Sequence, residues 1–115
     1  MGMEECVFCR IVRGEIPATV VHQDELAVAF RDVRPQAPTH VLVVPRRHVA
    51  SLAETTGEDA PLLGHLLALA AELARRLGLA SGYRVVVNTG PQGGQTVPHL
   101  HLHLLGGRAM AWPPG

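Results

Sequence analysis

The alternation of apolar and polar residues along the chain predicts one long helix and one short helix. Between residues 61 and 77, leucines recur at three- and four-residue spacing, which is the period of a helix that buries one face. Gly78 follows this stretch, and since glycine is common just after a helix C-terminus, we expect the helix to end there. A short helical turn is predicted over residues 6–13, ahead of Gly14 and Pro17.

Several segments rich in apolar or β-branched residues are predicted as strands. Residues 20–22 and 26–31 are separated by a polar Gln-Asp-Glu turn and form a predicted hairpin. Residues 40–44, with the sequence His-Val-Leu-Val-Val, are typical of a central strand. Two more strands are predicted at residues 83–88 and 100–105. About five strands, mostly in hairpins, with one long helix against them make an α+β fold.

The charge and aromatic content argue against a nucleic-acid partner. The 115 residues include ten basic and ten acidic ones, so the net charge is zero with histidine neutral. A protein that binds the phosphate backbone needs a broad basic surface, which this balance does not indicate. Only one tryptophan, one tyrosine and two phenylalanines are available to stack on bases.

No segment indicates a membrane partner or export. The longest unbroken apolar run, residues 66–71, is far shorter than the roughly 20 residues that span a bilayer. The first five residues, Met-Gly-Met-Glu-Glu, are acidic and contain no apolar signal region. We therefore expect a cytoplasmic protein with a single domain over residues 1–115.

Cys6 and Cys9 form a Cys-x-x-Cys pair near the start of the chain. Without a secretory signal a structural disulfide is not expected, which leaves free thiols, a metal site or a redox pair. A thioredoxin-type redox pair would follow a strand in a βαβ unit, and this pair does not. Zinc would need two more ligands, for which His48 and one of three clustered histidines are candidates. Spacing alone leaves zinc and free thiols open.

Three histidines, His99, His101 and His103, alternate with leucines. Successive side chains of a strand point to opposite faces, so the three histidines share one face. A catalytic metal is one use of such a face. Alternate Cα atoms lie about 6.5–7 Å apart, however, so three histidines on one straight strand converge poorly on an ion that needs ligands at about 2 Å. Alternatively, a neutral imidazole attacks phosphorus while its neighbours hold the phosphoryl oxygens.

The residues that precede the histidines favour the phosphorus chemistry. Gly93 and Gly94 let the backbone approach an anion closely, and Gln95 and Thr96 add amide and hydroxyl donors. Asn88, at the end of the preceding predicted strand, lies where it could add another polar contact. We therefore predict that residues 93–96 of this turn form a phosphate cradle.

With this motif and three other segments, the chain resembles the histidine triad (HIT) family, and more narrowly its histidine triad nucleotide-binding branch. The family signature is His-φ-His-φ-His-φ-φ, in which φ is apolar. The resemblance covers nearly the whole chain, through Cys-Val-Phe-Cys-Arg-Ile-Val-Arg-Gly-Glu-Ile-Pro at 6–17, Phe-Arg-Asp-Val-Arg-Pro-Gln-Ala-Pro-Thr-His at 30–40, the stretch at 93–108 and Trp-Pro-Pro-Gly at 112–115. The combination is more specific than the histidine motif alone.

The resemblance implies a homodimeric α+β protein that binds purine nucleotides such as AMP or GMP. It also implies hydrolysis of nucleoside 5′-phosphoramidates, which releases an amine and the nucleotide. His101 matches the family nucleophile, which forms a nucleotidyl-histidine intermediate, and His103 matches the residue that contacts the phosphate. His99 and His40 match the supporting histidines of the family's catalytic relay, which orient the nucleophile. No metal or other cofactor is expected to take part in catalysis.

Other positions match the family's nucleotide contacts. The residues that match phosphate, ribose and base contacts are Gly94, Gln95, Thr96, Asn88 and Asp32 on the polar side, and Phe8, Ile11, Phe30 and Val33 in the apolar base pocket. For each apolar position, simple core packing is an equally good interpretation. The transferase branch has glutamine at the third histidine, so His103 favours hydrolysis. Thr96 stands where the branch often has serine, which keeps a hydroxyl and adds a methyl on the leaving-group side.

Bacterial members of the family with a Cys-x-x-Cys pair hold a structural zinc with that pair, a histidine after the central strand and the first motif histidine. The resemblance therefore implies Cys6, Cys9, His48 and His99 as zinc ligands. A ligand role for His99 conflicts with a relay role, unless one ring nitrogen binds zinc and the other orients a catalytic histidine. Two other functions stay open: a zinc-dependent hydrolase with its metal on the histidine strand, and a nucleotide sensor or scaffold in which hydrolysis is incidental.

Overall fold

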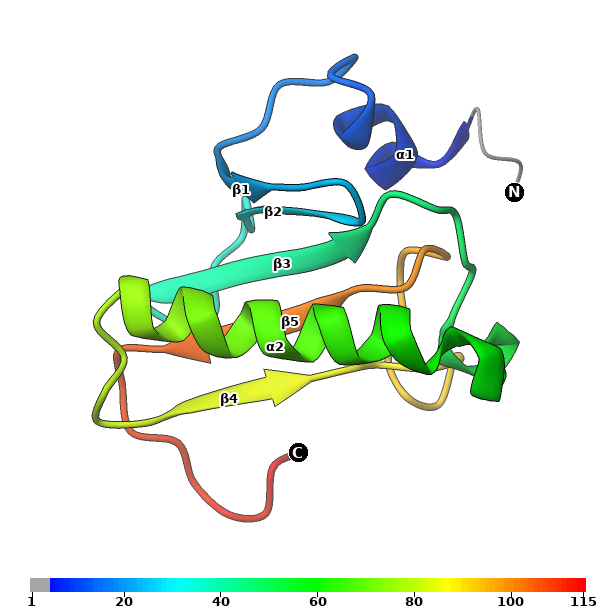
Figure 1. Ribbon diagram of the computed structural model, residues 1–115. Helices are drawn as coiled ribbons and strands as arrows, with labels where there is room; N and C mark the ends of the chain where they lie inside the picture. Colours follow the sequence, from blue (N-terminus) through cyan, green and yellow to red (C-terminus); the bar gives the residue numbers. More distant parts are fainter. Residues whose placement is uncertain (1–4) are drawn as a thin grey trace.

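A five-stranded antiparallel sheet organises the computed structural model, which describes residues 5–115 (Figure 1). The strands are β1 (Val20–Gln23), β2 (Ala27–Arg31), β3 (Thr39–Pro45), β4 (Tyr83–Val86) and β5 (Leu102–Gly106), in the spatial order β1-β2-β3-β5-β4. The sheet, a long helix and a short N-terminal helix confirm the predicted α+β fold. Most of the acidic start of the chain, residues 1–4, lies outside the described residues.

The long helix α2 (Ala60–Arg76) covers one face of the sheet (Figure 1). Three leucines of the predicted stripe, Leu66, Leu69 and Leu73, are buried together with Ala70 and Ala74, and the leucines at its two ends, Leu62 and Leu77, are partly buried. They pack on Val41 and Val43 of β3 and on Leu102 and Leu104 of β5. The chain leaves the helix through Gly78, whose positive φ of 76° is a backbone conformation that glycine adopts at little cost.

The opposite face of the sheet is covered by the short helix α1 (Val7–Val12). Its Phe8 packs with Phe30 of β2 and with Leu42 of β3 in a second, smaller core. Strand β3 is therefore buried on both faces, as its run of apolar residues predicts. The first helical turn is capped by the sulfur of Cys6, which accepts a hydrogen bond from the Cys9 amide at 3.4 Å.

The histidine segment departs from the prediction, because β5 begins at Leu102 and so contains only His103. Pairing between β3 and β5 starts with Val43 opposite Leu102. Before that point the chain leaves the ladder, and the Leu100 amide donates to the carbonyl of Val49 at 2.6 Å instead. Strand β4 likewise ends at Val86, two residues earlier than predicted.

The leucines and histidines of the motif nevertheless still point to opposite faces of the sheet before β5 begins. Leu100, Leu102 and Leu104 all lie in the core beneath α2. The ring of His101 lies instead beside that of Phe8, which belongs to the smaller core on the other face. Within residues 5–115, no helix is long and apolar enough to cross a membrane.

Candidate functional site

Two groups of polar side chains lie on the α1 side of the sheet. The first joins His40 of β3 to His103 of β5, whose Nε2 and Nδ1 atoms are 2.8 Å apart. Asp32, just after β2, places Oδ2 3.5 Å from the same His40 nitrogen. The ring of His101 lies beside that of His103, with centroids 4.9 Å apart. The fold thus brings together four of the predicted catalytic and ribose-binding residues from three neighbouring segments.

Hydrogen bonds determine which nitrogen of His40 and His103 carries the proton. The backbone amide of Gln36 donates to Nδ1 of His40 at 3.0 Å, so that nitrogen is an acceptor and the neutral ring carries its proton on Nε2. This Nε2–H donates to Nδ1 of His103. The proton of neutral His103 is therefore on Nε2, where it can serve as a hydrogen-bond donor to a ligand.

The tautomer of His101 follows from a different contact. Its Nδ1 lies 2.7 Å from the carbonyl oxygen of His99, which can only accept a hydrogen bond. Nδ1 of His101 therefore carries the proton, and Nε2 keeps its lone pair. An imidazole with a free Nε2 lone pair can act as a nucleophile.

Burial keeps these three rings neutral near pH 7. Desolvation lowers the pKa of His101, and it also lowers the pKa of His40, although Asp32 opposes the shift in both cases. For His103 desolvation acts together with the neighbouring His101 and His40 and lowers the pKa to about 4. Neutral rings are what the tautomers above require.

Arg108 belongs to the same hydrogen-bonded network, and sequence reasoning missed it. Its Nε donates to the carbonyl of Gln36 at 3.0 Å, so it holds the peptide chain whose amide fixes His40. Neither Gln36 nor Arg108 was predicted as a site residue. The role of Gln36 depends on a backbone amide, and no side-chain pattern in the sequence reveals it.

Two side chains of the glycine-rich turn that were predicted to contact the nucleotide instead form hydrogen bonds with the protein backbone. The side-chain nitrogen Nε2 of Gln95 donates to the carbonyls of Ala50 at 2.7 Å and Val97 at 3.0 Å. The side-chain oxygen of Gln95 accepts a hydrogen bond from the backbone amide of Gly90 at 3.1 Å. Asn88 donates to the carbonyl of Gly93 at 2.7 Å. These two side chains therefore shape the turn. The exposed hydroxyl of Thr96 forms no hydrogen bond within residues 5–115 and is the more available donor.

The predicted base-pocket residues have different environments. Phe8 lies edge-on to the ring of His101, with centroids 5.1 Å apart, and also packs on Phe30. Ile11 packs against the edge of the same core. Val33 contrasts with them, because it is 93% exposed on the loop after β2, beside Asp32.

The second polar group consists of Cys6, Cys9, His48 and His99, which we call the Cys/His cluster. Its ligand-type atoms all lie within 4.8 Å of one another. Nδ1 of His99 is 3.3 Å from the sulfur of Cys6 and 3.5 Å from that of Cys9, and Nδ1 of His48 is 3.2 Å from the sulfur of Cys9. Neither cysteine forms a disulfide bond.

The chemistry of the Cys/His cluster fits zinc. Two cysteines and two histidines are a common tetrahedral ligand set. Nε2 of His99 donates to the carbonyl of Pro45 at 2.9 Å, which leaves Nδ1 unprotonated and facing the sulfurs, as a ligand requires. Burial, with the neighbouring Cys6, raises the pKa of Cys9 to about 11, so its thiolate needs a cation beside it.

His99 contacts the cysteine sulfurs through its ring and His101 through its backbone carbonyl. Both ring nitrogens are engaged, one with the sulfurs and one with Pro45, so neither orients His40 or His101. The carbonyl oxygen of His99 orients His101 instead. The conflict between zinc binding and a relay role disappears, because the relay contact is made by the backbone.

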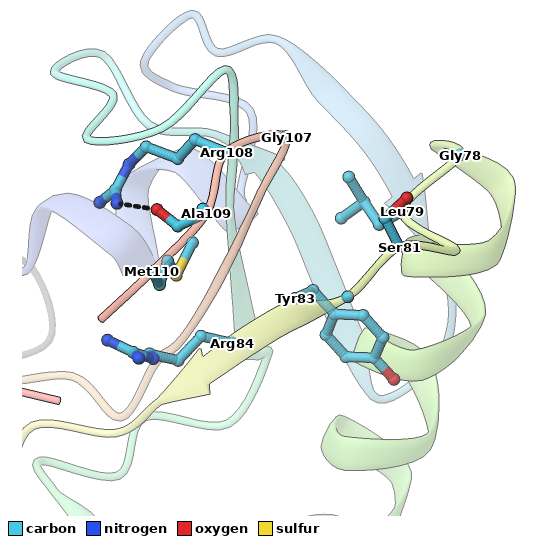
Figure 2. Close-up of a pocket in the computed structure, with 10 residues that line it drawn as sticks. Gly78, Leu79, Ser81, Tyr83, Arg84, Gly107, Arg108, Ala109 and Met110 are labelled. Carbon is cyan, nitrogen blue, oxygen red and sulfur yellow. Dashed lines mark hydrogen bonds between the residues drawn. The ribbon is translucent and has the colours of Figure 1, made fainter. Parts of the chain in front are cut away.

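Two depressions lie near β4 and β5 in the described part of the chain, and one of them borders the predicted site. A cavity of about 240 Å³ includes His40, His103, Asn88 and Arg108 in its lining. A larger one of about 620 Å³ adjoins it at the start of β4 and just after β5, shares Arg84, Arg108 and Met110 with it, and includes none of the predicted site residues. Figure 2 shows Arg84 and Arg108 on one side of this larger depression and Leu79 and Tyr83 on the other.

Comparison with known proteins agrees with the histidine motif. The HIT domain model matches residues 13–110. An uncharacterized HIT-like protein of Synechococcus elongatus is 58% identical over 112 residues, which are 97% of this chain and 98% of that protein. The 14 kDa zinc-binding protein of Zea mays is 50% identical over 111 residues, which are 95% and 87% of the two chains.

A solved structure extends the similarity to three dimensions. The crystal structure of a HIT family hydrolase from Legionella pneumophila has a TM-score of 0.95 and 54% sequence identity to this chain. The match covers 96% of this chain and 100% of that one. The family model and relatives along nearly the whole length lead to one conclusion: the chain belongs to the HIT family.

Proposed function

We propose that the protein hydrolyses the P–N bond of purine nucleoside 5′-phosphoramidates, with His101 as the nucleophile. The observation that carries the proposal is the complementary protonation of two adjacent rings. Hydrogen bonds leave His101 with a free Nε2 lone pair and give His103 an Nε2–H donor. A nucleophile beside a donor for phosphoryl oxygens is the arrangement that attack on phosphorus requires. The HIT family hydrolase from Legionella pneumophila supports the reaction class.

The reaction proceeds in two steps. In the first, Nε2 of His101 attacks phosphorus, the P–N bond breaks, and the leaving nitrogen takes up a proton from solvent to become an amine. The resulting nucleotidyl-imidazolium keeps its Nδ1–H bond to the His99 carbonyl, which stabilises the positive ring. In the second step water attacks phosphorus, the bond to Nε2 breaks, and a proton returns to solvent. The products are the amine and the nucleoside monophosphate.

Neighbouring residues hold the phosphate and the nucleoside. His103 donates to a phosphoryl oxygen through Nε2–H, and the Gln36–His40 contacts keep the proton on that nitrogen. Thr96 and the backbone around Gly94 form the other side of the phosphate site. Asp32 binds the ribose hydroxyls. The purine lies against Phe8, Ile11, Phe30 and Val33, and Asn88 and Gln95 keep the turn in shape.

The Cys/His cluster holds a structural zinc in this proposal, and the 14 kDa zinc-binding protein of Zea mays supports it. A metal on the histidine segment is less compatible with the contacts. The ligand-type atoms of Asp32, His40 and His103 lie within 4.8 Å of one another. However, the Gln36 amide occupies Nδ1 of His40, so the nitrogen facing such an ion carries a proton.

The protein acts as a cytoplasmic homodimer in this proposal. Strand β4 is at the edge of the sheet and pairs only with β5 among the described strands, which leaves one side of its backbone available to a second copy. Tyr83 on this strand is 45% exposed, and Trp112 in the tail that follows β5 is 85% exposed. Light scattering on the purified protein measures the number of copies.

AMP release from adenosine 5′-phosphoramidate tests the proposed reaction. Wild type and His101→Ala are assayed with and without a chelator, and circular dichroism checks that each remains folded. We expect turnover that chelation lowers but does not abolish, and that disappears in the variant. Turnover lost on chelation of folded protein would instead indicate a zinc-dependent hydrolase. AMP binding without turnover would indicate a nucleotide sensor or scaffold.

A further inference from the structure

His99 belongs to both polar groups of the molecule. Its ring is fully buried in the Cys/His cluster, with Nδ1 facing the sulfurs of Cys6 and Cys9. Its carbonyl oxygen accepts the Nδ1–H bond of His101 at 2.7 Å. A single residue thus connects a metal-binding set of side chains to the proposed nucleophile.

The position of the His99 carbonyl is not set by the sheet. His99 lies three residues before β5, and its amide makes only a local bond, to the carbonyl of Val97 at 2.9 Å. The next amide, of Leu100, bonds to Val49, which is itself in a loop. The tightest constraint on His99 is therefore its own side chain, held by the two sulfurs and by the carbonyl of Pro45.

A second connection runs through α1. Phe8 lies between the two cysteines in sequence, and its ring stands at 83° to that of His101, with centroids 5.1 Å apart. A six-residue helix has little stability of its own, so its position depends on what anchors it. Cys6 and Cys9 anchor it to His99 and His48. The Cys/His cluster thus fixes the aromatic side chain that borders the nucleophile.

We propose that the Cys/His cluster positions the nucleophile, so that a divalent cation bound there holds His101 in its reactive orientation. The proposal rests on the role of His101 under the proposed function. In three pairs, the sulfurs and ring nitrogens of the Cys/His cluster lie 3.2–3.5 Å from one another. At this spacing a single zinc ion could bind all four atoms at about 2.0–2.3 Å from the ion, and it would thereby fix both α1 and the His99 carbonyl.

Loss of the cation should change the tautomer of His101. When the His99 carbonyl is mobile, the Nδ1–H bond that selects this tautomer weakens, and the proton distributes over both ring nitrogens. A nucleophile displaced by about 1 Å typically costs about 100-fold in rate. We expect kcat to fall by about 10- to 100-fold without loss of the fold.

The experiment is nitrogen-15 NMR of histidine-labelled protein in three forms: zinc-loaded, chelated, and Cys6→Ser/Cys9→Ser. The expected result is one His101 tautomer with a slowly exchanging Nδ1–H in the loaded protein, and mixed tautomers with rapid exchange in the other two. The matched control is Asp24→Asn, which removes the carboxylate charge that faces His22 and His65 at 2.8 and 2.9 Å and leaves the four members of the Cys/His cluster in place. This variant should lose stability but keep the single tautomer.

A second variant keeps the test decisive if the emptied protein unfolds. His48→Gln removes one ligand but retains both cysteines and His99, and the contacts of His48 are with Cys9 and His99 rather than with the nucleophile. When zinc is titrated into this variant, the tautomer ratio of His101 and the kcat should both change with zinc concentration, and the two curves should coincide. Zinc binding that leaves both unchanged would overturn the proposal, as would mixed tautomers in Asp24→Asn. A loaded protein with one tautomer but no turnover would contradict the proposed function and leave the positioning intact.

Discussion

Replacing His103 with glutamine tests whether this ring is neutral in the folded protein. Burial, followed by the neighbouring His101 and His40, lowers its pKa from 6.5 to about 4. The unfolded chain therefore binds a proton here at pH values where the folded protein does not. The stability that a neutral His103 contributes is fully present above pH 6.5, and it is lost as the pH falls from 6.5 toward 4.

The expected magnitude follows from the size of the shift. For one group with these two pKa values, linkage gives a loss of about 2 kcal/mol between pH 7 and pH 5. His103 is partly accessible to solvent, which screens the effect, so we expect about 1–2 kcal/mol. Glutamine has a similar size and does not titrate, so His103→Gln should not show this loss.

Urea unfolding of both proteins at pH 7 and pH 5 measures the difference. Wild type should lose about 1–2 kcal/mol more than His103→Gln when the pH is lowered. His40 and His101 also have lowered pKa values, but they are present in both proteins and largely cancel. Equal losses in the two proteins would refute the neutral ring and, with it, the chain of tautomers that ends at His103.

Three further predictions concern other parts of the molecule. Plotted against pH, kcat/KM should stay level from neutrality to below pH 6.5 and then fall, because burial lowers the pKa of His101; a fall centred above 6.5 would contradict this. Arg108→Met removes the donor to the Gln36 carbonyl and so loosens the residue whose amide fixes His40; we expect kcat to fall about tenfold and NMR to show mixed tautomers of His40. An unchanged His40 tautomer would contradict this prediction. Leu73→Ala should destabilise the fold by about 2–5 kcal/mol in urea unfolding without changing zinc content, because Leu73 is a buried side chain of α2 in the core between this helix and the sheet.

Local patterns predicted most of the fold. The helix over 61–77 and the hairpin over 20–31 depend on neighbouring residues, and both are confirmed within about two residues. The start of the last strand could not be predicted in the same way. It is set by where β3 stops pairing, opposite Leu102, and by the bond from Leu100 to Val49. Partners that distant in sequence leave no periodic signal.

The candidate site was predictable in its side chains but not in its backbone contacts. The histidine alternation and the Cys-x-x-Cys pair indicate two groups of residues, and the fold brings each group together. The protonation pattern depends instead on the Gln36 amide and the His99 carbonyl, which any residue at those positions would supply. The sequence therefore carries no signal for them.

The most direct test of the central claim is detection of a nucleotide covalently attached to His101. Wild-type protein is mixed with adenosine 5′-phosphoramidate, the reaction is quenched rapidly in alkali, and mass spectrometry measures the intact protein and its peptides. The account predicts a mass increase of one adenylyl group on the peptide that contains His101, and none in His101→Ala. Continued AMP release by His101→Ala, or an adenylyl group on another residue, would contradict it.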